Sequence, residues 1–277
     1  MIKLMLRIVR QEGIMALFKK IVGKLKKVCK YRGMKHISRG KWEKNLKKKT
    51  ICLGKFFQAM QNVGGGISLR DMTFIPGGSL VLDYLLLKEI MVKYGLQNYL
   101  EIGTFIGESI SCMEEVSKKR ISITLPPDAP ELLNYFDTME TGNYANKLVS
   151  DDVIQYFADS KKFDFSKIKE RIDLYFIDGD HSYEGVYTDT KKVFNHKSKD
   201  SFVVWHDFKF SDMSIRREVV QAVVDAIGLE QFKRVYCCDN NMCGIYVPDK
   251  YRKDFNKLCH YNPDILYTYN LKLEIHE

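Results

Sequence analysis

Residues 99–107 constrain the fold most, because they join a strand pattern to a glycine-spaced turn. The apolar run closes with Glu101 and then breaks at Gly103 and Gly107, which allow a tight turn and close backbone approach. Residues 108–116 continue with helical spacing, and this order is typical of a loop that binds a nucleotide-type cofactor. The turn lacks the three-glycine spacing of dinucleotide-binding enzymes, and Glu101 lies where no pyrophosphate needs to be accommodated. A ligand without phosphates fits better.

Strand-like and helix-like segments alternate along the following chain. Strands are expected at residues 98–102, 120–125, 145–149, 172–177, 201–205, 232–238 and 242–247. Helices are expected at 80–94, 108–117, 131–144 and 182–194, with a further helix between residues 152 and 172. Ser79 is expected to cap the first of these helices. The turn residues 239–241 predict that the last two strands form an antiparallel hairpin. The pattern predicts an α/β fold with a doubly wound, mostly parallel seven-stranded sheet, helices on both faces and a terminal hairpin.

The charge distribution divides the chain. Residues 1–50 carry 17 Lys and Arg against two acidic residues, a local balance of +15, whereas the whole chain carries +9 and the remainder therefore about −6. We interpret residues 1–50 as a basic arm and linker, 51–97 as a lead-in helical segment, 98–248 as the core and 249–277 as a C-terminal tail. The basic character thus describes what the arm contacts and says little about a substrate.

The arm contains an amphipathic helix pattern. Its apolar side consists of Ile14, Leu17, Phe18, Ile21, Leu25 and Val28, and its basic side of Lys20, Lys24 and Lys27. Three interpretations stay open: binding of residues 1–30 to an anionic membrane surface, a helical cap or homo-oligomer contact, and contact with RNA. No apolar run reaches the roughly 18 residues of a spanning helix, and no signal-peptide cleavage site follows, so we expect no transmembrane segment.

The cysteines bear on the compartment. There are seven, in irregular spacing and without paired zinc-ligand motifs. Reduced thiols in a cytoplasmic protein are the simplest account. With the arm, this predicts a cytoplasmic location that includes the inner face of the membrane.

Polar side chains follow two of the predicted strands. Residues 176–184 place Asp178 and His181 directly after an apolar strand, and His206 and Asp207 follow the next one. Ligands bind beyond the carboxyl ends of strands in an open parallel sheet, so we expect these side chains in one crevice with Glu101. His206 has an alternative as a packed, hydrogen-bonded imidazole, whereas a histidine such as His181 at the mouth of the crevice can take a proton from a substrate hydroxyl.

Three motifs resemble those of class I S-adenosylmethionine-dependent methyltransferases, especially small-molecule and sugar O-methyltransferases with cephalosporin-hydroxylase-like relatives. They are residues 100–109 (LEIGTFIGES), 176–186 (FIDGDHSYEGV) and 203–208 (VVWHDF), in the order of that family and each at a predicted strand end. The likeness extends over residues 75–248. It implies a Rossmann-like methyltransferase fold and agrees with the predicted terminal hairpin.

The resemblance also implies roles for particular residues. Glu101, Gly103, Thr104 and Gly107 would hold the methionine and ribose side of the cofactor, and Ser150 with Asp151 would lie near the adenine. Asp178 would lie beside the methyl group. Where the family usually has a carboxylate for the ribose hydroxyls, this chain has Thr124, a weaker acceptor, with Asp128 as a substitute. Relatives that use Mg²⁺ bind it with carboxylates at the positions of Asp178 and Asp207.

The expected function is transfer of a methyl group from S-adenosylmethionine to a hydroxyl of a sugar, glycan or small molecule. His181 is the expected general base, with Asp178 and Asp207 either orienting it or binding Mg²⁺. The alternatives are an RNA-modifying methyltransferase, although nucleic acid is the less favoured partner, and a non-catalytic cofactor-binding or scaffold protein.

Overall fold

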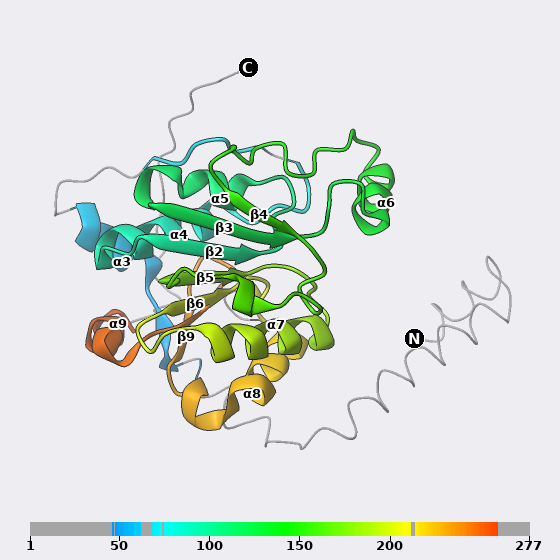
Figure 1. Cartoon of the computed structure of the whole chain (residues 1–277). Coiled ribbons are helices and arrows are strands. Elements are labelled where there is room, and N and C mark those ends of the chain that lie inside the picture. The colour runs from blue at the N-terminus through cyan, green and yellow to red at the C-terminus, as the bar shows by residue number, and fades with distance from the viewer. Residues whose placement is uncertain (1–45, 47, 62–67, 74, 212–213, 260–277) are drawn as a thin grey trace, which may run out of the picture. The chain divides into compact units, whose positions relative to one another are not determined.

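The computed structural model describes residues 46, 48–61, 68–73, 75–211 and 214–259, all within the unit Leu46–Glu277 (Figure 1). The amphipathic pattern predicted for residues 14–28 and most of the C-terminal tail lie outside the described residues. The described part contains no helix with the length and apolar character needed to span a membrane.

The centre of the fold is an eight-stranded sheet in the order β1-β9-β10-β6-β5-β2-β3-β4. Its neighbouring strands run parallel except β10, which is antiparallel to both β6 and β9. The strands are β1 (Thr50–Ile51), β2 (Asn98–Ile102), β3 (Lys119–Thr124), β4 (Ile154–Phe157), β5 (Leu174–Ile177), β6 (Phe202–Trp205), β9 (Val235–Cys238) and β10 (Gly244–Tyr246). The predicted α/β class, with a mostly parallel sheet and a terminal antiparallel hairpin, is confirmed.

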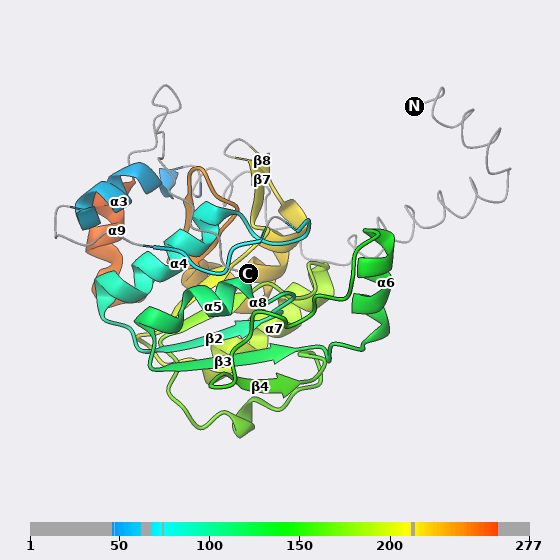
Figure 2. The ribbon, with the colours of Figure 1, turned by 90° about the horizontal axis from the view of Figure 1, so that it is seen from above.

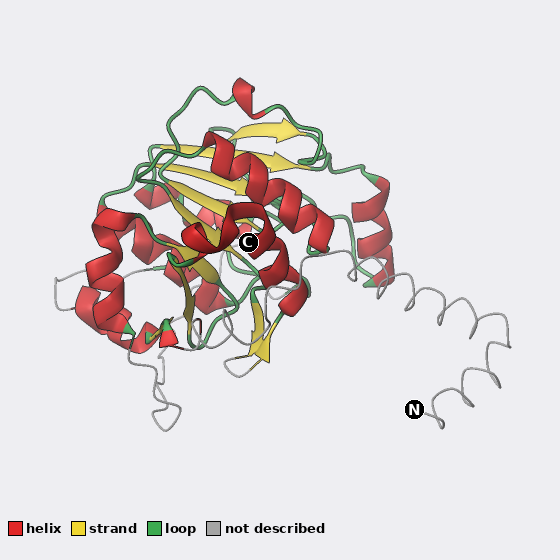
Figure 3. Cartoon of the chain, turned by 90° about the horizontal axis from the view of Figure 1, so that it is seen from below, coloured by secondary structure: helices red, strands yellow, loops and turns green. Residues whose placement is uncertain are grey.

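Helices cover both faces of this sheet (Figures 1 and 2). One face carries α3 (Leu53–Gln61), α4 (Val81–Tyr94), α5 (Glu108–Cys112) and α9 (Arg252–Leu258). The other carries α7 (Tyr183–His196) and α8 (Arg217–Phe232), which lie in front of the sheet in Figure 3. Central strands covered on both sides need apolar residues at every position, which explains the unbroken apolar runs of β5 and β6.

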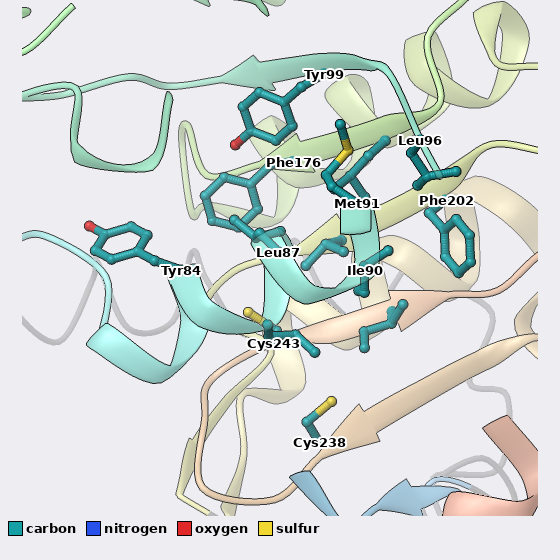
Figure 4. Close-up of a cluster of buried hydrophobic side chains, with 14 of the residues drawn as sticks. Tyr84, Leu87, Ile90, Met91, Leu96, Tyr99, Phe176, Phe202, Cys238 and Cys243 are labelled. Carbon is teal, nitrogen blue, oxygen red and sulfur yellow. The ribbon is translucent and has the colours of Figure 1, made fainter. Parts of the chain in front are cut away.

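The main core lies between α4 and the sheet (Figure 4). Leu87, Ile90 and Met91 of α4 are fully buried against Tyr99, Phe176 and Phe202 of the strands; this core also contains Cys238 and Cys243. Both cysteines are free and buried, in agreement with the interpretation of reduced thiols. The core fixes α4 directly over β2, β5 and β6, the strands whose carboxyl ends carry the site.

Two sequence predictions about this sheet were wrong. The eighth strand, β1, was missed because its two residues pair only at the edge, beside β9. The strand expected at residues 145–149 is a series of turns, and the strand at this edge is β4 instead. Ala145 and Leu148 are apolar because they pack beside Ile106 and Phe136, in a small cluster outside the sheet. The backbone of Asn146 and Leu148 donates to the carbonyls of residues 105 and 106, so this segment follows the turn after β2.

Several of the remaining elements differ from the prediction. Between residues 152 and 172 the structure has β4 and a 3₁₀ turn in place of the expected helix. The helix expected at residues 131–144 is α6 (Pro130–Thr138), and the one expected to reach residue 117 ends as α5 and continues as η1 (Glu114–Val116). The sequence analysis did not identify α8 or the small hairpin of β7 (Lys209–Ser211) and β8 (Ser214–Ile215). The 3₁₀ turns η2 (Phe165–Lys167) and η3 (Asp249–Tyr251) complete the described elements.

Candidate functional site

The glycine turn after β2 contacts the turn after β5. Gly103 has φ +87°, and a Cβ at this position would lie 2.3 Å from the carbonyl oxygen of Asp178. Gly107, with φ +109°, starts α5 where a Cβ would lie 2.8 Å from Cγ2 of Val149. Both glycines are therefore required by conformation and by space. The turn thus packs directly on the backbone that follows β5, at the carboxyl edge of the sheet.

Glu101 is completely buried beneath this turn. Its Oε2 accepts hydrogen bonds from the hydroxyls of Tyr99 at 2.9 Å and Ser109 at 2.6 Å. Burial raises the pKa of Glu101 to about 7, against the opposing effect of the hydroxyls of Ser109, Thr104 and Tyr99. Its Oε1 has no hydrogen-bond partner among the described residues. A buried acceptor without a donor is costly, so this oxygen fits a ligand that brings an ammonium or hydroxyl donor.

An acid–histidine cluster lies where β5 and β6 end. Nδ1 of His181 is 3.1 Å from Oδ2 of Asp207 and 4.0 Å from Oδ1 of Asp178. One ligand atom from each of these three residues falls within 4.8 Å of the others, a spacing that a divalent cation can bridge. Nη1 of Arg216 lies 2.8 Å from Oδ2 of Asp207 and already neutralises part of this charge.

His206 is a packed imidazole held between two carboxylates. Its Nδ1 lies 3.1 Å from Oδ1 of Asp178, and its Nε2 lies 3.1 Å from Oδ2 of Asp83. Burial disfavours the charged ring, but the two carboxylates outweigh burial and raise the pKa of His206 well above its ordinary value. In turn, burial opposes the charge of Asp178, whereas the His206 ring lowers the pKa of that carboxyl. Of the two alternatives for His206, the hydrogen-bonded one describes its environment.

Three residues of this cluster were missed by sequence reasoning. Ser79 does not cap α4; its Oγ donates to Oδ2 of Asp178 at 3.0 Å, while Asp83 caps the helix by accepting from the backbone of Leu80. The capping position of Asp83, three residues into the helix, was a signal that could have been found. Arg216 follows a hairpin whose strands are too short to detect, so nothing local pointed to it.

The predicted cofactor residues fall into two groups. Thr124 ends β3 beside the glycine turn, where its hydroxyl accepts a 3.4 Å hydrogen bond from the backbone of Thr104, and the Thr104 hydroxyl contacts Ser122. Ser150 instead lies at the amino end of β4, where it contacts Arg120 near the start of β3. Asp151 is exposed beside it. The structure therefore does not bring Ser150 and Asp151 to the cluster, and the loop that follows the carboxyl end of β4 begins at Ala158 instead.

An exposed aromatic ring borders the cluster. Phe210 on β7 is 62% exposed, and the guanidinium carbon of Arg216 lies 5.6 Å from the centre of its ring. An aromatic face beside charged groups gives an apolar substrate surface a place to pack. The site thus combines an imidazole, carboxylates and one exposed aromatic ring at one edge of the sheet.

Comparison with known proteins identifies the central segment. A family model described as "Methyltransferase domain" matches residues 100–208. A 114-residue stretch is 30% identical to an uncharacterized protein of Acanthamoeba polyphaga mimivirus; the match covers 40% of this chain and 51% of the relative. The chain thus spans about half the length of this relative.

Solved structures are similar only at a coarse level. A putative O-methyltransferase from Klebsiella pneumoniae is 12% identical, with 70% of this chain and 86% of that chain covered and a TM-score of 0.41. An S-adenosylmethionine-dependent methyltransferase from Clostridium acetobutylicum is 16% identical, with 46% and 49% covered and a TM-score of 0.31.

The family match runs from the third residue of β2 to just beyond Asp207 and contains all three sequence motifs. The resemblance to methyltransferases is confirmed for this segment, because residues 100–208 match a model of the methyltransferase domain.

Proposed function

We propose that the protein transfers a methyl group from S-adenosylmethionine to a hydroxyl of a small molecule or sugar. The observation that carries this proposal is the arrangement of Asp178, His181 and Asp207 at the edge of a sheet whose central segment matches a methyltransferase domain. When bound, the cofactor supplies an electrophilic methyl group on a sulfonium. The residues of the chain have to bind it, orient the acceptor and remove a proton.

Cofactor binding is assigned to the turn after β2. The unpartnered Oε1 of Glu101 fits a donor of the cofactor, and the turn of Gly103, Thr104 and Gly107 fits close approach of a ligand to the backbone. Thr124 lies beside this turn and offers a hydroxyl. These contacts support cofactor binding at the carboxyl ends of β2 and β3.

His181 is the proposed general base. Its side chain is 41% exposed, so it can meet an acceptor, and its Nδ1 lies beside the carboxylate of Asp207. With Nδ1–H directed at Asp207, Nε2 is the nitrogen that accepts the proton of the acceptor hydroxyl. Asp207 therefore orients the imidazole, and Arg216 holds Asp207 in place.

A divalent cation is the alternative occupant of this cluster. Asp178, His181 and Asp207 would hold it, and it would lower the pKa of a bound hydroxyl. If it takes part, we expect EDTA to abolish turnover and Mg²⁺ to restore it. Unchanged turnover in EDTA would remove the cation from the proposal and leave His181 with Asp207 as the base pair.

The decisive experiment is titration calorimetry of the full chain with S-adenosylmethionine. We expect saturable binding at one site per chain, and absence of heat from folded protein would reject the proposed function. The acceptor is then identified by incubating a cell extract with the protein and cofactor labelled in the methyl group, followed by mass spectrometry. Label in a small molecule or glycan supports the proposal, whereas label in RNA would replace it with the RNA-modifying alternative.

A further inference from the structure

We propose that Asp83, which lies outside the matched methyltransferase segment, is a positioning residue for Asp178. The inference rests on the proposed function in one respect, namely that Asp178 acts on the cofactor or acceptor. Asp83 is not exposed at the cluster of Asp178, His181 and Asp207, because its side chain is completely buried at the start of α4. It acts through two other residues.

The first route runs through His206. The ring is only 8% exposed, and each of its nitrogens lies 3.1 Å from a carboxylate oxygen, one of Asp83 and one of Asp178. With a carboxylate at each nitrogen, both nitrogens donate, so the ring is fixed in its plane and cannot flip without losing both hydrogen bonds. Asp83 thereby fixes the His206 ring, and the ring fixes the position of Oδ1 of Asp178.

The second route runs through the start of α4. Oδ2 of Asp83 accepts a hydrogen bond from the backbone of Leu80 at 2.9 Å and so fixes the first turn of the helix. The residue directly before Leu80 is Ser79, whose hydroxyl donates to Oδ2 of Asp178 at 3.0 Å. Both oxygens of Asp178 are therefore held by groups that Asp83 holds.

Asp83 is in turn anchored on the side away from the site. Its Oδ1 accepts a hydrogen bond at 2.9 Å from the backbone of Met242, in the turn between β9 and β10. Cys243 places its thiol 3.6 Å from the same oxygen. The carboxylate thus has a partner on each oxygen and joins α4, the end of β6 and the terminal hairpin to one another.

The test variant is Asp83→Asn, which keeps the shape and one oxygen. That oxygen can still accept from Met242, but the new amide group faces two donors, Leu80 N–H and His206 Nε2–H. Both routes to Asp178 are lost together. The matched control is Glu89→Gln, which also removes a buried carboxylate from α4 but lies outside the site.

Two measurements on the full chain decide the matter. The dissociation constant of S-adenosylmethionine by calorimetry is expected to rise about 10-fold or more in Asp83→Asn, as is usual for partners that orient functional groups, and to stay unchanged in Glu89→Gln. The ring N–H protons of ¹⁵N-labelled His206 are expected to give two protected signals in the wild type, and Asp83→Asn to lose the Nε2–H signal.

A double variant separates positioning from a general structural role. If Asp83 acts through Asp178, adding Asp83→Asn to Asp178→Asn produces no further loss of cofactor affinity. If the fold-losses of affinity in the two single variants multiplied in the double variant, the proposal would be overturned. An Asp83→Asn protein with the same cofactor affinity as Glu89→Gln would overturn it as well. If Asp83→Asn fails to fold, Ser79→Ala tests the second route alone, with a several-fold weaker affinity expected and an unchanged one contradicting it.

Failure of the proposed function gives a different result. A wild-type protein that binds no cofactor would reject the methyltransferase activity, while the His206 signals would still show whether Asp83 holds the ring. If both ring N–H signals of His206 persist in Asp83→Asn, the positioning role is overturned, whatever the activity of the protein.

Discussion

At the residue scale, the sequence pointed to side chains after β5 and β6 that the structure brings close together. Asp178, His181 and Asp207 lie together because parallel strands end at the same edge, a rule that needs no knowledge of packing. The residues that hold them could not be found in this way. Ser79 is 99 residues away from Asp178 in sequence, and Asp83 is 123 residues away from His206. Such pairings are set by tertiary packing; the capping position of Asp83 was visible in the sequence, but its contact with His206 was not.

His181→Ala is expected to lower turnover by about 10²- to 10⁴-fold, the usual contribution of a general base. Its imidazole is partly exposed and outside the turn assigned to the cofactor, so calorimetry should give an unchanged S-adenosylmethionine affinity. The affinity serves as the internal control for folding. Turnover equal to that of the wild type would remove His181 from the mechanism.

Glu101 predicts a pH dependence of stability. Burial raises its pKa from 4.5 to about 7, so the folded state binds the proton more tightly than the unfolded state. The contribution of Glu101 to the free energy of unfolding is therefore fully present below about pH 4.5. It falls by roughly 3 kcal/mol as the pH rises toward 7. Urea titrations give the free energy of unfolding at each pH. Between these pH values it should fall less in Glu101→Gln than in the wild type, by about this amount.

The control for this titration is Glu131→Gln, the same chemical change at an exposed position of α6. It should follow the wild-type curve. A Glu101→Gln curve parallel to the wild-type curve would mean that the buried carboxyl does not change its proton affinity on folding.

At the element scale, strands that are buried on both faces were predicted well, and edge elements were not. The patterns of β2, β5 and β6 come from burial alone and are visible in the sequence. Residues 145–149 have a similar apolar pattern for another reason, since they pack on the turn after β2 and on Phe136. The strand β1 has only two residues, and the strands of the hairpin β7–β8 have three and two. Such short strands show no alternation of apolar and polar residues in the sequence.

The turn after β2 gives a prediction about its first glycine. Gly103→Ala is expected to lower the free energy of unfolding by at least about 3 kcal/mol, because a Cβ would combine positive φ with overlap on the Asp178 backbone. Gly95→Ala is the matched control, since Gly95 also has positive φ but open space around it; we expect a loss of about 1–2 kcal/mol. Equal losses in chemical denaturation would show that the two turns are not tightly packed.

At the scale of the whole molecule, the basic arm remains a prediction from sequence, as its amphipathic pattern lies outside the described residues. We propose that it binds the full chain to anionic membrane surfaces. Each lysine near such a surface contributes about 1 kcal/mol, so replacing Lys20, Lys24 and Lys27 by Glu should weaken vesicle binding by roughly 100-fold or more.

Flotation with phosphatidylserine-containing vesicles tests the arm, with neutral phosphatidylcholine vesicles as the control. The wild type should float with the anionic vesicles only, and less so at high salt. Equal recovery of the wild type and the triple Lys→Glu variant would reject membrane binding by the arm.

The contacts of Asp83 have a consequence for how the protein reaches its native state. This carboxylate closes loops of 123 residues to His206 and 159 residues to Met242, so its hydrogen bonds can form only after the central strands and the last hairpin have assembled. During refolding, we therefore expect secondary structure to recover first and ligand affinity last. A chain that stops short of the final hairpin would possess every motif of the domain and still lack a competent pocket.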